Sequence, residues 1–179
     1  GRQNGAVAAH TGVGQIRGHR ILGRTRRSGL DLEPDLGRPV SGIEIVNCSL
    51  KNTQLLPLTL GGNGNISDIN IHDNEFGGNE VSIKNNNPLT TKFQDIRFAR
   101  NLHTGNVGPA LRFDNVIRLV AADNFFSRFP EATENTPAIR VKDCTDVFIR
   151  RNKSEGSMLC VGPQGIVTGT IGAPVGQPG

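Results

Sequence analysis

The feature that most constrains this chain is a six-residue pattern that returns about every 26 residues. Six fragments align without gaps, and they begin at Ile16, Ile45, Ile71, Phe98, Ala121 and Ile149. Their fourth column reads His19, Cys48, Asn74, Asn101, Asn124 and Asn152, at intervals of 29, 26, 27, 23 and 28 residues. Because the interval is nearly constant over most of the 179 residues, the sequence predicts one repetitive domain rather than two ordinary ones.

A second column lies between the members of the first. It consists of short alternations of apolar and polar residues that begin at Leu30, Leu58, Val81, Leu111 and Ile139, with residues 159–161 as a sixth member. Each period therefore holds two short strands separated by turn residues, and no helical periodicity is sustained. Strands that return at a fixed interval predict an all-β parallel β-solenoid of about six coils over residues 1–165. Residues 166–179 then form a Gly/Pro-rich tail or a final irregular coil.

The repeated asparagine suits such a coil in two ways. Asparagine tolerates the left-handed backbone of a tight bend, and its side-chain amide can bond the same group one coil away. The chain has no Trp or Tyr, which fits a narrow interior filled by aliphatic side chains. We expect most of its eight Phe residues in that interior, with Phe125, Phe126 and Phe129 as an alternative surface platform.

The segment Gly-Leu-Asp-Leu-Glu-Pro at residues 29–34, together with residues 40–50, resembles the β-helix-repeat proteins of bacteria and phages. These belong to the right-handed parallel β-helix proteins of the pectate-lyase-like superfamily. The resemblance implies a right-handed coil and trimeric assembly of tail-spike kind. It does not choose a function, because the superfamily contains lyases, glycosidases, adhesins and tail spikes. The catalytic motifs of its pectate lyases and polygalacturonases are incomplete in this chain.

Asp31 and Glu33 are the candidate catalytic pair. Residues two apart on a strand project from one face with their Cα atoms about 6.7 Å apart. That spacing suits the acid and base of an inverting glycosidase, whose carboxyl groups lie roughly 6.5–9.5 Å apart. The alternative is a solvated pair, or a carboxylate that holds the turn at Pro34 or an arginine among Arg24, Arg26 and Arg27.

A candidate substrate-binding group follows on later coils of the same column. It consists of Lys84, Arg112, Asp114, Arg140 and Lys142. Stacked guanidinium groups repel each other unless an anion lies between them, so Arg112 and Arg140 could hold a uronate, sulfate or phosphate. The alternative is structural pairing with Asp114 and Asp143.

Other classes of site are not supported. Three cysteines at wide spacing and four scattered histidines predict neither disulfides, a metal site nor a cofactor, and we expect the histidines at turns or facing solvent. The sequence contains no run of 18 apolar residues, so it predicts no membrane span. Six arginines in the first 27 residues suit an anionic partner, but no nucleic-acid-binding module accompanies them.

Three functions remain open. The first is a β-helix module of a phage tail spike or surface adhesin, outside the cell or on a virion, that presents a lateral face to a surface polysaccharide. The second is a polysaccharide lyase or glycosidase that acts on an acidic glycan through Asp31 and Glu33 with Arg112 or Arg140. The third is a structural spacer in a larger assembly. A homotrimer or larger assembly is expected for the first.

Overall fold

The structure is a computed structural model that describes residues 6–7, 14–18, 20, 28–51, 53, 56–105, 109–127, 137–155, 159–166 and 169–171. Within these ranges the chain forms nineteen β-strands and no helix. The predicted all-β class is therefore confirmed. None of the described elements is a helix long and apolar enough to cross a membrane.

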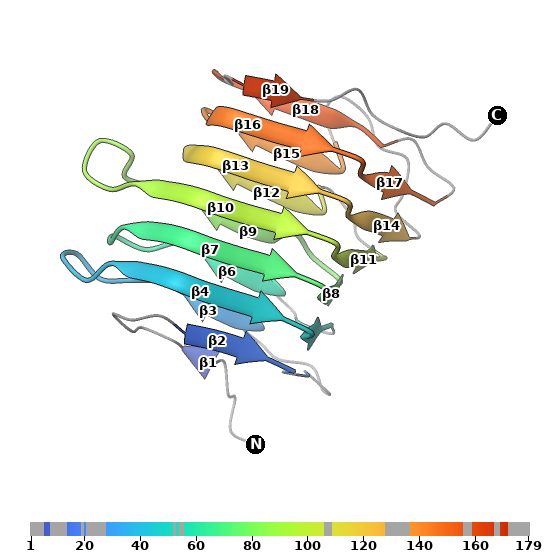
Figure 1. Cartoon of the computed structure of the whole chain (residues 1–179), viewed down its shortest axis with the longest axis horizontal. Helices are drawn as coiled ribbons and strands as arrows, with labels where there is room; N and C mark the ends of the chain where they lie inside the picture. Colours follow the sequence, from blue (N-terminus) through green and yellow to red (C-terminus); the bar gives the residue numbers. More distant parts are fainter. Residues whose placement is uncertain are drawn as a thin grey trace.

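The strands form three parallel sheets (Figure 1). Sheet A contains β1 (Ala6–Val7), β3 (Leu30–Leu32), β6 (Leu58–Leu60), β9 (Val81–Lys84), β12 (Leu111–Asp114), β15 (Ile139–Lys142) and β18 (Val161–Gln164). Sheet B contains β2 (Gly14–Arg17), β4 (Val40–Val46), β7 (Ile66–His72), β10 (Phe93–Ala99), β13 (Val116–Ala122), β16 (Thr145–Arg150) and β19 (Gly169–Ile171). Sheet C contains β5 (Ser49–Leu50), β8 (Glu75–Gly77), β11 (Leu102–Thr104), β14 (Phe125–Ser127) and β17 (Lys153–Ser154).

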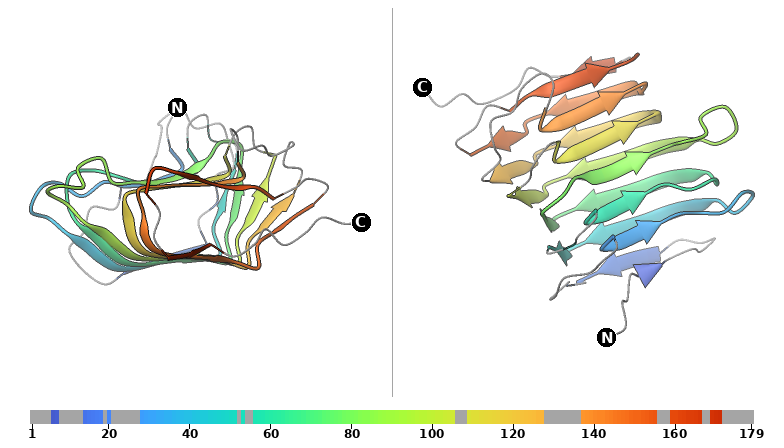
Figure 2. Two further views of the ribbon diagram at one scale, coloured as in Figure 1. Left: turned by 90° about the horizontal axis from the view of Figure 1, so that it is seen from above. Right: turned by 180° about the vertical axis from the view of Figure 1, so that it is seen from behind.

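The chain visits sheets B, C and A in that order and then begins the next turn. Viewed along the stack, the three sheets enclose one elongated interior (Figure 2). This is the predicted parallel β-solenoid, with about four turns, slightly fewer than the six or so expected. The outer strands of sheets A and B extend the coil beyond these turns. In the C-terminal segment, β19 pairs with β16.

The register confirms both sequence columns. In sheet B, Ile71 lies opposite Ile45 and Phe98, and in sheet A, Leu111 lies opposite Val81 and Ile139. One member was placed wrongly: Val161, not Leu159, lies opposite Ile139. Leu159 is nevertheless buried, because it lies just before β18 and turns its side chain into the core.

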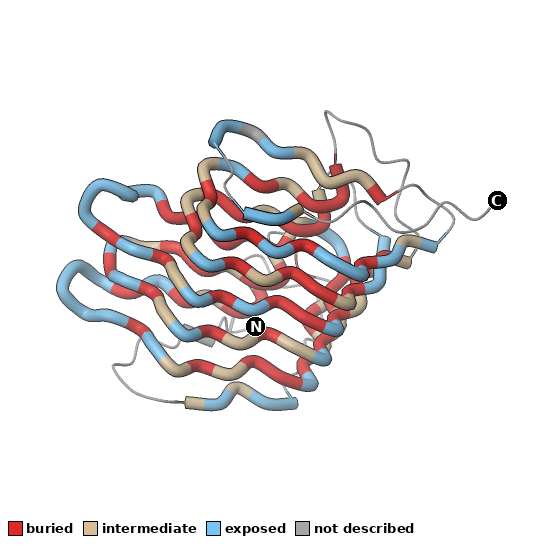
Figure 3. Tube along the Cα trace, turned by 45° about the horizontal axis from the view of Figure 1, so that its top comes forward, coloured by how far each residue is buried: buried red, intermediate tan, exposed pale blue. Residues whose placement is uncertain are grey.

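The core is a continuous stack of inward side chains, visible as alternating buried and exposed positions in Figure 3. It contains the expected aliphatics and also Phe76, Phe98, Phe113 and Phe126, which are fully buried. His103 lies among these rings, with ring centroids 5.2 Å from Phe76 and 5.1 Å from Phe126. The expectation that this histidine faces solvent or lies in a turn was wrong. The registers of β8, β11 and β14 place it inside sheet C, directly between the two phenylalanines.

The asparagine column forms the predicted ladder. Asn74 donates its side-chain amide to Asn101 Oδ1 at 3.0 Å, Asn101 donates to Asn124 Oδ1 at 3.2 Å, and Asn124 donates to Asn152 Oδ1 at 2.9 Å. Each Oδ1 also accepts the backbone N–H one turn earlier, and each Nδ2 also donates to a sheet B carbonyl. All four side chains are buried. The ladder therefore ties together the corner between sheets B and C.

The left-handed backbone expected of these asparagines lies one residue earlier. Positive φ angles occur at Asn47, Asp73, Arg100, Asp123 and Arg151. Two successive residues therefore have separate roles at the corner. The first residue makes the bend, and the next residue turns its side-chain amide into the interior.

Sheet B has a second left-handed column near the start of its strands. Its members are Gly42, Asp68, Asp95, Arg118 and Asp146, with φ between 53° and 65°. The paired register skips this position between Phe93–Gln94 and Ile96. The paired residues keep the same offset before and after this position, so each strand bends there without an extra residue, and the bends stack from turn to turn.

Candidate functional site

The predicted site residues share the outward face of sheet A. Asp31, Thr59, Ser82, Arg112 and Arg140 occupy one register column. In the next outward column of the same sheet, Asp114 pairs with Lys84 and Lys142. Arg112 and Arg140 are register neighbours on successive turns, as expected. Asp31, however, lies three strand spacings from Arg112, about 14 Å, so the structure places the carboxylates and the arginines on one face without bringing them into contact.

Asp31 lies in β3 and is partly buried. Its Oδ1 is buried and has no hydrogen-bond partner among the described residues. Burial, reinforced by the negative charge of Glu33, raises the pKa of Asp31 to about 6. Glu33 follows the strand and is exposed. Arg24, Arg26 and Arg27, the arginines considered as its partners, lie outside the described residues.

Arg112 is held by carboxylates. It donates to Asp114 Oδ2 through Nε at 2.9 Å and Nη2 at 2.7 Å, and its Nη1 lies 3.9 Å from Glu80 Oε1. Asp114 is 2% exposed. Burial raises the pKa of Glu80, an effect that Arg112 opposes. At Arg112 the structure therefore contains the structural ion pair that was the alternative to anion binding, and it adds Glu80, which was not predicted from the sequence.

The remaining predicted residues lie nearer the surface. Lys84 is half-buried, and Lys142 lies 4.0 Å from Asp143, whose Oδ1 accepts the backbone N–H of Ile166 at 2.9 Å. Arg140 is half-buried and has contacts of its own. Among the described residues, no group of His, Cys, Asp and Glu side chains could hold a metal ion.

The outward side of sheet B carries three bidentate ion pairs between successive turns. Arg100 pairs with Asp73, Arg118 with Asp95, and Arg151 with Asp123. All six residues occupy the left-handed columns. These pairs were not predicted from the sequence, although the third column of the aligned fragments alternates in charge, with Asp73, Arg100, Asp123 and Arg151.

His72 lies on the same face between two carboxylates. Its Nε2 is 2.7 Å from Glu44 Oε1 and its Nδ1 is 2.6 Å from Asp73 Oδ2. The hydrogen bond from Arg100 lowers the pKa of Asp73 to about 2. Because both ring nitrogens face carboxylate oxygens, His72 has no lone pair directed toward solvent. The cluster is therefore arranged as a hydrogen-bonded network around the ion pair of Arg100 and Asp73 rather than as a general base.

A hollow of about 400 Å³ lies on sheet B where β10, β13 and β16 run side by side. Its floor includes Val120 and the ring of Phe148, and its rim includes Arg97, Asp95, Arg118 and Asp146. Phe148 is 49% exposed. The expected surface platform was wrong in this respect: Phe126 is buried, Phe129 lies outside the described residues, and Phe148 joins Phe125 as an exposed ring.

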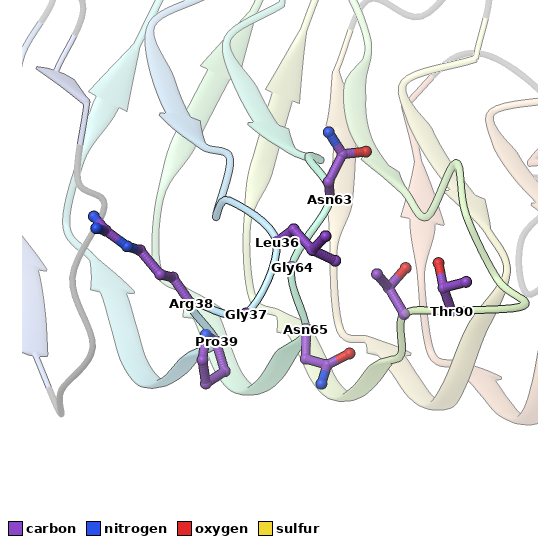
Figure 4. Close-up of a pocket in the computed structure, with 9 residues that line it drawn as sticks. Leu36, Gly37, Arg38, Pro39, Asn63, Gly64, Asn65 and Thr90 are labelled. Atoms are coloured by element: carbon purple, nitrogen blue, oxygen red, sulfur yellow. The ribbon is translucent and has the colours of Figure 1, made fainter.

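A second hollow, of about 300 Å³, lies at the edge where the chain passes from sheet A to sheet B (Figure 4). It is lined by parts of three successive loops, with Leu36 and Arg38 in the first, Asn63 in the second and Thr90 in the third. Asn87 donates to Asn63 at 2.6 Å and joins two of the loops. Arg38 extends away from Asn63 and Thr90 in this view, so the hollow itself is lined mainly by short polar and apolar groups.

These features define a class, the parallel β-solenoid protein with charged and aromatic groups on its lateral faces. No protein-family model, curated protein or solved structure matches the chain. The surfaces of this molecule are therefore the basis on which its function is inferred.

Proposed function

We propose that the protein is a glycan-binding β-helix module of tail-spike or adhesin kind, which presents a lateral face to a surface polysaccharide. Membership of the pectate-lyase-like superfamily, a place outside the cell or on a virion, and homotrimeric assembly form part of this proposal. They follow from the resemblance of residues 29–34 and 40–50.

The observation that carries the proposal is the hollow around Phe148 on sheet B. Its apolar floor, formed by Phe148 and Val120, is bordered by carboxylates and guanidinium groups. A sugar ring has one apolar face and a periphery of hydroxyl groups, so it can cover an exposed aromatic ring while its hydroxyls bond polar groups at the rim. The flat strands of three turns give the hollow a rigid base.

The test is a binding assay of the whole chain against immobilised acidic and neutral polysaccharides. Phe148→Ala should weaken binding about tenfold, because the stacking surface is lost while the core is unchanged. Phe125→Ala is the matched control, since Phe125 is 40% exposed but lies outside this hollow, and it should change affinity less than about twofold. Equal losses in the two variants, or no binding to any polysaccharide, would contradict the proposal.

Assembly is tested separately by light scattering on the eluting protein. The proposed module gives the mass of a trimer of 19.2 kDa chains. A monomer at all concentrations would remove the trimer from the proposal without affecting the glycan site.

A second function is favoured by one specific observation, the carboxyl group of Asp31. A pKa raised to about 6 suits a general acid, and Glu33 supplies a second carboxylate two residues away. If the chain is a lyase or glycosidase, incubation with polysaccharides releases unsaturated uronates or new reducing ends, and Asp31→Asn abolishes the release. A structural spacer, the third alternative, gives neither cleavage nor binding.

A further inference from the structure

Five arginines on or directly after β10, β13 and β16 of sheet B fall into two groups. Arg100, Arg118 and Arg151 each donate two hydrogen bonds to an aspartate of the preceding turn. Within the part of the chain that the structure describes, Arg97 and Arg150 form no ion pair, and both are exposed. Their guanidinium groups therefore keep their donors available for an external acceptor.

Both unpaired arginines flank the ring of Phe148. Arg150 lies two residues further along β16 and projects from the same face, at a Cα separation of about 6.7 Å. Arg97 belongs to the same register column as Phe148, with Val120 between them, which places it two strand spacings or about 10 Å away.

The register neighbours of Arg150 on the two preceding turns are Ala122 and Ala99, which are buried and carry no charge. Both arginines also contribute, after the hydrogen bond from Arg151, to lowering the pKa of Asp123. Their positive charges therefore act together on the region between Phe148 and the corner of the coil.

Arg150 lies just outside the lining of the hollow, whereas an acidic residue on the other side of Phe148 belongs to that lining. Asp146 lies two residues before Phe148 on β16, is exposed, and raises the pKa of Arg118, whose main partner is Asp95. Along this one strand, a carboxylate, an aromatic ring and a guanidinium group therefore follow one another at intervals of two residues. A ring-shaped ligand on Phe148 would have an acceptor for its hydroxyl groups on one side and donors for an anionic group on the other.

We infer that the hollow selects an anionic glycan, with a sugar ring on Phe148, its carboxylate or sulfate group toward Arg150 and Arg97, and its hydroxyl groups toward Asp146. This inference rests on the proposed function and adds the charge and the orientation of the ligand. Guanidinium groups suit this task because they bind planar oxyanions through two parallel hydrogen bonds and keep their charge at all physiological pH values.

The experiment uses three probes with one backbone: dextran, carboxymethyl-dextran and dextran sulfate. At 0.15 M salt, where long-range charge effects are screened beyond about 8 Å, the anionic probes should bind the whole chain about tenfold more tightly than dextran. The carboxymethyl and sulfate arms show which anionic group is preferred. The double variant Arg97→Gln/Arg150→Gln should reduce the preference to about threefold or less.

The matched control is the double variant Arg100→Gln/Arg151→Gln, which removes the same formal charge from paired arginines of the same sheet face. It should keep most of the preference for anionic probes. Equal binding of dextran and its anionic forms, or a preference that survives the loss of Arg97 and Arg150, would overturn the inference and leave the glycan site of the proposed function standing. If Phe148→Ala changes none of the affinities, or none of the probes binds, the proposed function fails as well.

Discussion

Asp31 illustrates how a single carboxyl group on the solenoid surface can be poised for protonation. Its Oδ1 is removed from water without a partner among the described residues, and Glu33 adds a like charge, so the neutral form is favoured in the folded chain. The pKa of about 6 lies above the ordinary value of 3.8. Between these two values the folded state binds more protons than the unfolded state, so this group lowers the free energy of unfolding as the pH rises.

We therefore expect Asp31→Asn to stabilise the protein at pH 7.5 by about 1 kcal/mol, after allowance for solvent screening. At pH 3.5 the variant and the natural chain should be nearly equal, because Asp31 is then protonated in both states. Urea denaturation at the two pH values measures the difference. A destabilised Asn variant at pH 7.5 would contradict this account of the site.

His103 gives the opposite pH dependence. Burial lowers its pKa from 6.5 to about 3, so below pH 6.5 the unfolded chain binds a proton that the folded chain does not. The contribution of neutral His103 to the free energy of unfolding is therefore fully present above pH 6.5 and falls as the pH decreases toward 3. His103→Phe, which keeps an aromatic ring between Phe76 and Phe126, should remove about 2 kcal/mol of the loss between pH 7 and pH 5. Melting curves across this range measure it, and a variant with the same acid sensitivity as the natural chain would refute the assignment.

For single residues, the sequence predicted the strand face on which a side chain lies better than the side chains that it contacts. The period of two along a strand correctly placed Asp31, Lys84 and Arg112 on one outward surface. It could not predict the contact between Arg112 and Glu80, because Glu80 precedes the alternating segment. Phe148 was predictable in principle: it lies between the inward Val147 and Ile149, so the same alternation directs it outward.

Among the structural elements, the asparagine ladder is the one whose loss should cost most. Asn101→Ala removes the acceptor of two hydrogen bonds from Asn74 and the donor of two others, and it leaves buried backbone groups without partners. We expect a loss of about 3 kcal/mol in the free energy of unfolding. The control is Asn70→Ala on the outward face, where the side-chain oxygen has no partner in the described chain, and it should cost less than about 1 kcal/mol. Urea denaturation measures the loss of free energy of unfolding in both variants. Similar losses in the two variants would contradict the role of the ladder.

The ladder ends at Cys48, which occupies the same column. Its backbone N–H donates to Asn74 Oδ1 at 2.9 Å, and its thiol lies 3.7 Å from the carbonyl of Ile16. That carbonyl is the counterpart of the Ile45 carbonyl, which Asn74 bonds at 2.9 Å. Cys48→Asn should therefore add a rung and stabilise the protein by about 1 kcal/mol, measured by thermal denaturation. A destabilised variant would show that the corner at β4 and β5 has no room for an amide.

The bends show what a repeat alone does not reveal. Asparagine was expected to make the left-handed bend, since isolated Asn and Asp residues accept positive φ most readily. In the structure Arg100 and Arg151 make it in two turns. An arginine gains nothing locally from that conformation, but there its side chain reaches the aspartate of the preceding turn, and this cross-turn contact cannot be derived from one turn considered alone.

For the molecule as a whole, the repeat predicted the solenoid because each turn can bury its apolar side chains only against its neighbours. The regular intervals were sufficient to predict which residues of the two columns lie opposite each other on successive turns. They overestimated the number of turns because the pattern continues to the ends of the stack, where β2 and β19 are followed by no strand of sheet C among the described residues. The binding surfaces could not be predicted in the same way, since they depend on side chains brought together from three or more turns.

Stacking also predicts where the molecule opens first. Strands β7, β10 and β13 have a paired strand on each side, whereas β2 and β19 are outermost in sheet B. In native-state hydrogen exchange we expect the amides of β10 to exchange about 100-fold more slowly than those of β19, because opening proceeds from the ends of the stack. Uniform protection throughout sheet B would show that the coil opens as a single cooperative unit.

The corner column that reads Asp73, Arg100, Asp123 and Arg151 implies a rule of parity. The backbone repeats once per turn, but the charges at this corner repeat only every second turn. Excision of the turn that contains Arg100 would set Asp73 directly against Asp123, two like charges, whereas excision of two consecutive turns would bring Asp73 to Arg151. Shortening by an even number of turns should thus be tolerated better than shortening by an odd number.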